Sequence, residues 1–136
     1  MRGMGFRDQV FVYGTLRRGC SNHHCMKGAT LLGRHRTAPV YRMLDLGPYP
    51  AVVEGEEPIT GEVYSVTAAM LRQLDRLEDH PRTYTRSRIH TPWGDAWIYL
   101  YRKRCPQLPP VPGGDWLGGS VERPEFRSRI RRADEQ

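Results

Sequence analysis

The sequence feature that most constrains the fold is a short apolar run near the N-terminus, Val10 to Tyr13, which stops at Gly14. An apolar run with β-branched residues is typical of a strand that is buried on both faces. Gly14 tolerates both a positive φ and the close approach of another segment. Successive backbone N–H groups at such a strand end can hold an anion or a developing oxyanion. An ordinary tight turn is the alternative.

Length and composition indicate a single globular domain. The chain has 136 residues, of which 38% are hydrophobic and 26% charged, as in ordinary globular proteins. It has no apolar stretch of the roughly 20 residues that span a membrane, and Met1 to Asp8 lack the apolar core of a signal peptide. Three cysteines then predict free thiols in a reducing compartment. We expect a cytoplasmic protein with no membrane partner, as a monomer or weak homodimer.

The net charge of +6 is unevenly distributed. Residues 17–36 carry five Lys or Arg and no acid, whereas residues 45–79 carry eight acids and two Arg. Residues 80–104 carry six Lys or Arg and one acid. This distribution suits a small anionic ligand at least as well as a polynucleotide, and we expect no nucleic-acid partner.

Hydrophobic patterns and turn residues predict an α+β fold. The predicted strands span residues 10–13, 29–36, 40–46, 51–53, 59–66, 84–91 and 96–102. A helix capped by Thr67 is predicted to run to about Glu78, ahead of Pro81. We expect a small mixed, largely antiparallel β-barrel with one main helix and short helical turns. The domain is predicted to span residues 1–117, and residues 118–136 to form a basic tail that is partly disordered or a short helix.

The last predicted strand carries an aromatic stripe. Trp97, Tyr99 and Tyr101 share one face of it, because side chains alternate along a strand. We interpret this stripe as packing against neighbouring parts of the sheet.

One acidic side chain lies on the apolar face of the predicted helix. Counted from Met70 at 100° per residue, Leu74 lies at about 40°, Leu77 at about −20° and Leu71 at about 100°, so the apolar stripe centres near 30°. Glu78 lies at about 80°, within this stripe. A carboxylate there is partly desolvated, which raises its pKa toward the range useful for proton transfer. A Glu that reaches solvent at the helix end, or pairs with an Arg, is the alternative.

Three motifs occur in order along the chain: Val-Phe-Val-Tyr-Gly-Thr-Leu-Arg-Arg-Gly at 10–19, Gly-Glu-Val-Tyr at 61–64 and Leu-Asp-Arg-Leu-Glu-Asp-His-Pro at 74–81. Together they resemble the gamma-glutamylcyclotransferase-like family, and within it the gamma-glutamylamine cyclotransferase and AIG2-like branch. The resemblance covers roughly residues 9–104. It implies a small mixed β-barrel with helices packed against it.

The resemblance also implies a site and a reaction. In the family's enzymes the Tyr-Gly-Ser/Thr-Leu loop holds the substrate, and the Glu after the Leu-Asp pair accepts a proton. The implied substrate-binding residues here are Tyr13, Gly14, Thr15 and Leu16, and Glu78 is the implied catalytic acid/base. The small-molecule substrate is a γ-glutamyl amine or peptide, which the enzyme converts to 5-oxoproline and a free amine. This reaction needs no metal and no other cofactor.

The sequence departs from the family at Asp79, where many relatives have Gly after the Glu. If the Asp79 carboxylate points inward, it raises the pKa of Glu78 further. Some members of the superfamily lack the Glu altogether, so the fold alone does not establish catalysis. A non-catalytic module that binds a small anion on the same barrel is therefore the alternative function, and a nucleic-acid binder is a third.

Other polar residues near the first loop suggest weaker sites. Cys20, His23, His24 and Cys25 lie close together, but their spacing fits no common structural zinc site, and we expect no metal. Neither cysteine has a base placed beside it by the sequence, which argues against a nucleophile. From the resemblance, Asn22 and His23 belong to the loop structure near the cleft.

Two further expectations concern the pocket. We expect Gly14–Leu16 and Glu78 to lie close together and to line the largest polar pocket. We also expect an Arg from the basic stretches, Arg17 or Arg86, near the mouth of this pocket, where it would attract an anionic substrate.

Overall fold

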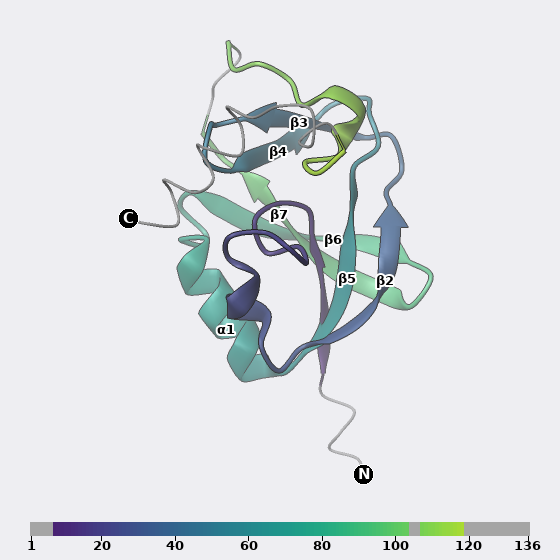
Figure 1. Ribbon diagram of the computed structural model, residues 1–136, viewed down its shortest axis with the longest axis vertical. Coiled ribbons are helices and arrows are strands. Elements are labelled where there is room, and N and C mark those ends of the chain that lie inside the picture. Colours follow the sequence, from purple (N-terminus) through teal and green to yellow (C-terminus); the bar gives the residue numbers. More distant parts are fainter. Residues whose placement is uncertain (1–6, 104–106, 119–136) are drawn as a thin grey trace.

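The structure is a computed structural model, which describes residues 7–103 and 107–118. A five-stranded sheet has the order β2–β5–β1–β7–β6, and β3 and β4 form a separate hairpin (Figure 1). The strands are β1 (Asp8–Val12), β2 (Thr30–Arg36), β3 (Tyr41–Asp45), β4 (Pro50–Glu54), β5 (Thr60–Val66), β6 (Tyr84–Thr91) and β7 (Gly94–Tyr101). The helical elements are α1 (Ala68–Leu77) and two short 3₁₀ turns, η2 (His23–Met26) and η3 (Pro112–Gly114).

Strand β1 is the middle strand of the sheet, as its apolar run predicted. It pairs antiparallel with β5, with Val10 opposite Tyr64, and parallel with β7, with Val10 opposite Trp97. The other strand pairs are antiparallel. Val10 and Phe11 have exposed fractions of 0% and 1%, because both faces of β1 are covered. Because β1 is covered on both faces, its C-terminal end lies inside the fold and can line a cavity there.

The α+β class and the largely antiparallel sheet are confirmed, but the predicted closure into a barrel is wrong. Strands β2 and β6 end the sheet order at opposite sides and do not pair with each other. Strands β3 and β4 pair only with one another, from Tyr41 opposite Glu54 to Asp45 opposite Pro50. They therefore form a hairpin across one end of the open sheet instead of joining its edges (Figure 1).

Two hydrophobic clusters cover the two faces of the sheet. On one face, Leu71 and Leu74 of α1 join a cluster with Val10 and Val12. On the other, Met43 and Val52 of the β3–β4 hairpin join a cluster with Phe11. The alternation of side chains along β1 thus divides the core into a helix side and a hairpin side.

Helix α1 begins and ends as the sequence predicted, within one residue. Thr67 is its N-cap, and its Oγ1 accepts a hydrogen bond from the Met70 N–H at 3.1 Å. The helix ends at Leu77, so Glu78 is the C-cap residue. Leu71 and Leu74 of the predicted apolar stripe are its buried residues, whereas Leu77 of the same stripe is 47% exposed at the end of the helix.

The chain after β7 returns to the sheet. Trp116 is buried, and Val111 N–H donates a hydrogen bond to the Met43 carbonyl at 2.9 Å. Of the predicted tail, residues 119–136 lie outside the described residues, as does Cys105. None of the described helices has the length and apolar character needed to cross a membrane.

Candidate active site

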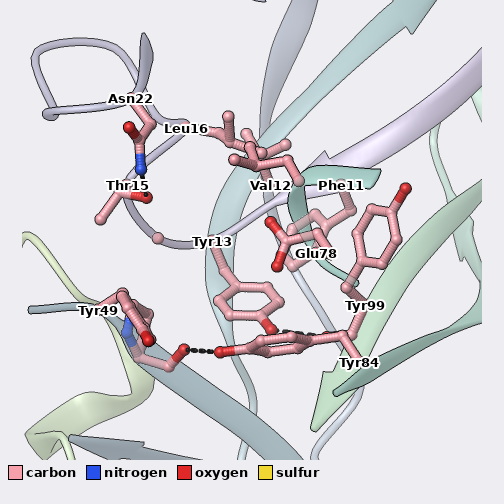
Figure 2. A pocket seen from close by; sticks show the side chains of 13 residues that line it. Phe11, Val12, Tyr13, Thr15, Leu16, Asn22, Tyr49, Glu78, Tyr84 and Tyr99 are labelled. Carbon is pink, nitrogen blue, oxygen red and sulfur yellow. Dashed lines mark hydrogen bonds between the residues drawn. The ribbon is translucent and has the colours of Figure 1, made fainter. Parts of the chain in front are cut away.

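A cavity of about 110 Å³ opens at the end of β1, between the sheet and the C-terminus of α1 (Figure 2). All five residues predicted for the site line it: Tyr13, Gly14, Thr15, Leu16 and Glu78. The loop and the carboxylate, far apart in sequence, therefore meet in one cavity, as expected. It is not the largest hollow, however, since a groove of about 390 Å³ lies beside Arg17.

The first wall of the cavity is the loop that follows β1. Gly14 lies so close to the β3–β4 hairpin that an added Cβ would be 2.7 Å from Cγ of Pro50 and 2.8 Å from its Cδ. Its φ is not in the left-handed region. Of the two reasons for a glycine here, a positive φ and the close approach of another segment, the second therefore applies to Gly14.

The backbone N–H groups of this loop are available to a ligand. Among the described residues, no hydrogen bond uses the N–H of Gly14, Thr15 or Leu16. The next N–H, of Arg17, donates to the Gly14 carbonyl at 3.0 Å and closes the turn. Three consecutive unused donors beside a cavity can hold a carboxylate or an oxyanion.

Asn22 and His23 form hydrogen bonds that hold this loop in place. Asn22 lines the cavity, and its Nδ2 donates a hydrogen bond to Thr15 Oγ1 at 2.9 Å (Figure 2). The Asn22 N–H donates to the Thr15 carbonyl, also at 2.9 Å. His23 Nδ1 lies 3.0 Å from the Leu16 carbonyl, a bond that requires the proton on Nδ1. These contacts place both residues in the loop structure beside the cleft.

The second wall carries Glu78, held by a helix-terminating motif. The His80 N–H donates to the Asp75 carbonyl at 2.8 Å, and the Asp79 N–H to the Arg76 carbonyl at 3.2 Å. This pair of bonds is the Schellman motif, which needs a left-handed residue just after the C-cap. Asp79 fills that position with a φ of +53°. A glycine would adopt this left-handed conformation without strain, whereas Asp79 adopts it with a Cβ.

The Asp79 carboxylate does not point toward Glu78. It accepts hydrogen bonds from Arg82 Nη2 at 3.0 Å and from Thr83 Oγ1 at 2.8 Å, and 46% of its side chain is exposed. The condition for a further rise in the pKa of Glu78, an Asp79 carboxylate that points inward, is therefore not met.

Glu78 itself is a desolvated carboxyl group. Its side chain lines the cavity and is partly buried, and this burial raises its pKa from the ordinary 4.5 to about 7. Within the described part of the chain, no side chain or N–H group donates a hydrogen bond to its carboxylate, and it forms no ion pair. A carboxyl group with a pKa near neutrality can both accept and release a proton at physiological pH.

Three tyrosines form the floor of the cavity (Figure 2). The Tyr13 hydroxyl donates to the Tyr99 carbonyl at 2.6 Å, and the Tyr84 hydroxyl to the Pro50 carbonyl at 3.0 Å. Burial is the largest cause of the raised pKa of Tyr13, and the charge of Glu78 adds to it. Tyr13 is thus neutral, and the hydroxyl bonds fix the rings of Tyr13 and Tyr84 in the lining of the cavity.

No arginine of the described residues lines this cavity, so the expectation for Arg17 and Arg86 is wrong. Arg86 forms a two-bond ion pair with Asp75, through Nε at 2.7 Å and Nη2 at 2.9 Å. Arg17 is turned toward Asp115, on the other side of the loop. Both guanidinium groups stabilise the fold around the site and are not at its mouth.

Several lining residues were not predicted for the site, namely Phe11, Val12, Tyr49, Pro50, Leu77, Tyr84 and Tyr99. Tyr99 belongs to the aromatic stripe, which does pack into the helix-side core as interpreted. It also reaches the cavity, which alternation along a strand does not reveal. The sequence does give a weak indication that Tyr49 and Pro50 belong to the site. They lie in a rigid Gly-Pro-Tyr-Pro turn, and such a turn can pack closely against another segment.

The fold and the motifs identify the class of protein. Residues 10–118 match the family model described as gamma-glutamyl cyclotransferase, AIG2-like, and the chain belongs to this family. A Vibrio cholerae protein with the name "Putative gamma-glutamylcyclotransferase" is 50% identical over 107 residues, which cover 79% of this chain and 93% of that protein.

Two other relatives are informative. The crystal structure of an AIG2-like protein from Mus musculus superposes with a TM-score of 0.72 at 28% identity, covering 85% of this chain and 92% of that chain. The gamma-L-glutamyl-butirosin B gamma-glutamyl cyclotransferase of Niallia circulans is 38% identical over 81 residues, 59% of this chain and 51% of that enzyme.

Proposed function

We propose that the protein is a cyclotransferase that converts a γ-glutamyl amine or peptide to 5-oxoproline and a free amine. The observation that carries this proposal is the position of Glu78. Its unpaired carboxylate has a pKa near 7 and shares one cavity with three unused backbone N–H groups. A site that only binds an anion has little use for a carboxylate beside the ligand.

The reaction begins with the α-ammonium of the γ-glutamyl group. Glu78 removes one of its protons, and the resulting amine attacks the carbonyl carbon of the γ-amide, forming a C–N bond and an oxyanion. Protonated Glu78 then returns its proton to the leaving nitrogen as the bond to that nitrogen breaks and the oxyanion becomes a carbonyl again. The ring nitrogen, which still carries two hydrogens after the attack, releases one of them to water, and the free amine takes up a proton from water. No oxidant or nucleotide enters this balance. Because the attack is intramolecular, the cavity contributes mainly by holding the substrate folded.

The Gly14–Leu16 amides are assigned to the anionic groups of the substrate. They hold the α-carboxylate, the oxyanion, or both, because no cationic side chain of the described residues lines the cavity. Tyr13 and Tyr84, which also line the cavity, shape its floor beneath the carbon chain.

The leaving amine is assigned to the mouth of the cavity. Tyr49, just before β4, and Leu77, the last residue of α1, are 44% and 47% exposed, and both line the cavity. An apolar leaving amine can lie between them, whereas an amino acid brings a carboxylate that meets no cationic lining residue. We therefore expect alkyl and aromatic γ-glutamyl amides to be better substrates than γ-glutamyl amino acids.

The test is release of 5-oxoproline from a panel of γ-glutamyl amides with alkyl, aromatic, polyamine and amino-acid leaving groups. Turnover of at least one class, lost in Glu78→Gln, supports the proposal. If no member of the panel is turned over but 5-oxoproline or a γ-glutamyl amide still binds, the protein is instead a non-catalytic binding module. Tyr49→Ala and Leu77→Ser should raise KM for the alkyl and aromatic amides more than for the amino-acid substrates.

A further inference from the structure

We propose that Arg17 and Asp115 are positioning residues that hold the Gly14–Leu16 loop in place from the side opposite the cavity. The proposal rests on the proposed function for its catalytic consequences. Its structural consequence, a fixed loop, can be measured without any substrate.

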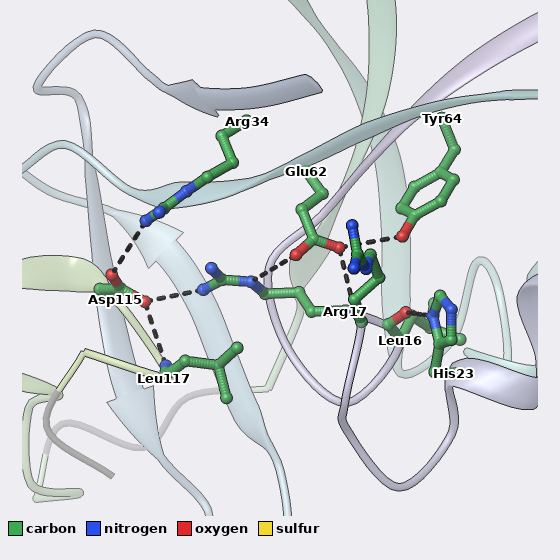
Figure 3. A network of polar contacts seen from close by, with 9 residues as sticks. Leu16, Arg17, His23, Arg34, Glu62, Tyr64, Asp115 and Leu117 are labelled. Atoms are coloured by element: carbon green, nitrogen blue, oxygen red, sulfur yellow. Dashed lines mark hydrogen bonds and ion pairs between the residues drawn. The ribbon is translucent and has the colours of Figure 1, made fainter. Parts of the chain in front are cut away.

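Arg17 directly follows the loop, and its side chain reaches toward Asp115 and Glu62 (Figure 3), in the groove and not in the cavity. Its exposed fraction is 3%, which is unusual for an arginine. Its N–H donates to the Gly14 carbonyl at 3.0 Å, so the backbone of Arg17 closes the turn that carries the three unused donors. A shift of the Arg17 side chain is therefore transmitted to the loop.

Two carboxylates from other parts of the fold hold the guanidinium group. Arg17 Nη1 donates to Asp115 Oδ1 at 2.7 Å, and Arg17 Nε lies 3.6 Å from Glu62 Oε2 of β5. Nε has no hydrogen-bond partner within normal distance among the described residues. The short bond to Asp115 is thus the main fixed contact of this buried cation.

Glu62 holds the far end of the same turn. Its Oε1 accepts hydrogen bonds from the Arg18 N–H at 2.9 Å and from the Tyr64 hydroxyl at 3.0 Å (Figure 3). The side chain of Glu62 has an exposed fraction of 9%. The turn is therefore connected to β5 through a backbone bond at Arg18 and through the charge of Arg17.

Asp115 brings the C-terminal segment to this network. Its Oδ1 also accepts the Leu117 N–H at 3.0 Å, and Arg34 lies at 4.0 Å from its other oxygen. The neighbouring Trp116 is 2% exposed, so the segment is anchored in the core. Although burial favours the neutral acid, the hydrogen bond and charge of Arg17 lower the pKa of Asp115 below its ordinary value. Asp115 is therefore an ionised, fixed partner at neutral pH.

None of Arg17, Glu62 and Asp115 lines the catalytic cavity; all three line the larger groove on the other side of the loop. They cannot touch a substrate held beside Glu78, so any effect on catalysis must pass through the loop. A charged residue that loses its buried partner relaxes toward water, and the loop amides would move with it. Displacement of catalytic groups by about 1 Å can cost on the order of 100-fold in rate.

The experiment compares Asp115→Asn, Arg17→Lys and Arg17→Met with Arg88→Met, a control that breaks an exposed ion pair with Asp95. We expect Asp115→Asn and Arg17→Met to lower kcat/KM for a γ-glutamyl amide by about 100-fold, Arg17→Lys to lower it less, and Arg88→Met to leave it unchanged. The midpoint of the pH profile should stay where it is, because Glu78 is held by the C-terminal end of α1 and is not moved. The double variant Arg17→Met/Asp115→Asn should be no worse than the worse single variant, since both act through one contact.

Amide chemical shifts of the folded variants give a readout independent of activity. We expect the Gly14, Thr15 and Leu16 amides to shift in Asp115→Asn while those of Leu77 and Glu78 stay in place. Unchanged loop amides in folded Asp115→Asn, or kcat/KM within twofold of wild type, would overturn the proposal. So would an activity loss that follows only the unfolded fraction. If wild type releases no 5-oxoproline, the proposed function fails, while the amide shifts still decide whether Asp115 positions the loop. Arg17→Lys keeps the charge and serves if Arg17→Met does not fold.

Discussion

The hydroxyl of Tyr99 donates a 2.6 Å hydrogen bond to Oδ1 of Asp75, which joins the centre of β7 to the last turn of α1. Asp75 lies one helical turn before Glu78 and also carries the two-bond ion pair with Arg86. The end of the helix is thereby held at two points from the sheet. The position of Glu78 thus depends on the hydrogen bond between Tyr99 and Asp75, and Tyr99 itself lines the cavity.

Tyr99→Phe removes this hydrogen bond and should destabilise the protein by about 2 kcal/mol at neutral pH, since the acceptor is charged. Burial opposes ionisation of Asp75, but hydrogen bonds from Arg86 and Tyr99 outweigh it and lower its pKa. The stabilisation is therefore present above the ordinary pKa of Asp and is lost as pH falls through the lowered one. Chemical denaturation at pH 7 and pH 3 measures both values. An equal loss at the two pH values would contradict this assignment.

Glu78→Gln should lower kcat by 10² to 10⁴, on the order expected for loss of a general base, and leave binding of 5-oxoproline nearly unchanged. Gln keeps the size and reach of Glu but cannot accept the ammonium proton. The matched control is Asp79→Asn, which changes the adjacent carboxylate outside the cavity and should keep full turnover. If Glu78→Gln retains most of its turnover, Glu78 has no part in the chemistry.

The raised pKa of Glu78 predicts the pH dependence of both activity and stability. As a base, Glu78 works when ionised, so kcat/KM should rise with pH to a plateau, with a midpoint near 7. Ionising it inside the folded protein is unfavourable, so wild-type stability should fall as pH rises from about 4.5 to about 7. Glu78→Gln does not titrate, and its Tm advantage over wild type should therefore grow across this range. Thermal unfolding from pH 4.5 to pH 8 measures it; a constant difference would refute the desolvation argument.

Gly14→Ala should move the loop, because the new Cβ would lie 2.7 Å from Cγ of Pro50. We expect kcat/KM to fall by at least about tenfold through displacement of the loop amides, with a loss of about 1 to 3 kcal/mol in stability from overpacking. Adding Pro50→Ala removes the two clashing carbons and should restore part of both. Failure of this second change to restore anything would mean that Gly14 matters for another reason.

Asp79→Gly should be more stable than Asp79→Ala by about 1 kcal/mol, because Asp79 has a φ of +53° and an alanine there is strained. Both variants lose the same bonds to Arg82 and Thr83, so the difference isolates the backbone. Both should keep near wild-type kcat/KM. Equal unfolding free energies for the two variants would show that the left-handed turn is not maintained in solution.

The sequence predicts well those features that depend on neighbouring residues. The period of the helix placed Glu78 within the stripe of Leu71 and Leu74, and the Thr67 cap and Pro81 set its limits. The apolar run of β1 predicted a central strand for the same reason: local chemistry requires it to be buried on both faces.

Features that depend on pairing across the chain could not be predicted in this way. The basic stretch predicts that Arg17 is charged. It does not predict that Arg17 forms an ion pair with Asp115, 98 residues away, outside the cavity. Alternation assigned Tyr99 to a face without showing that a cavity opens beside it. Closure of the sheet depends on which edges meet, and nothing in the strand patterns specifies that β2 and β6 stay apart.

The contact between Arg17 and Asp115 also bears on when the protein becomes functional during its synthesis. The loop is translated early, but the carboxylate that fixes it comes 98 residues later, and β1 lies between strands that are both translated after it. Pairing of such distant segments delays folding until most of the chain is present. A nascent chain that has not yet exposed Asp115 therefore has its substrate loop without this anchor, and the site is completed only as the last described segment docks.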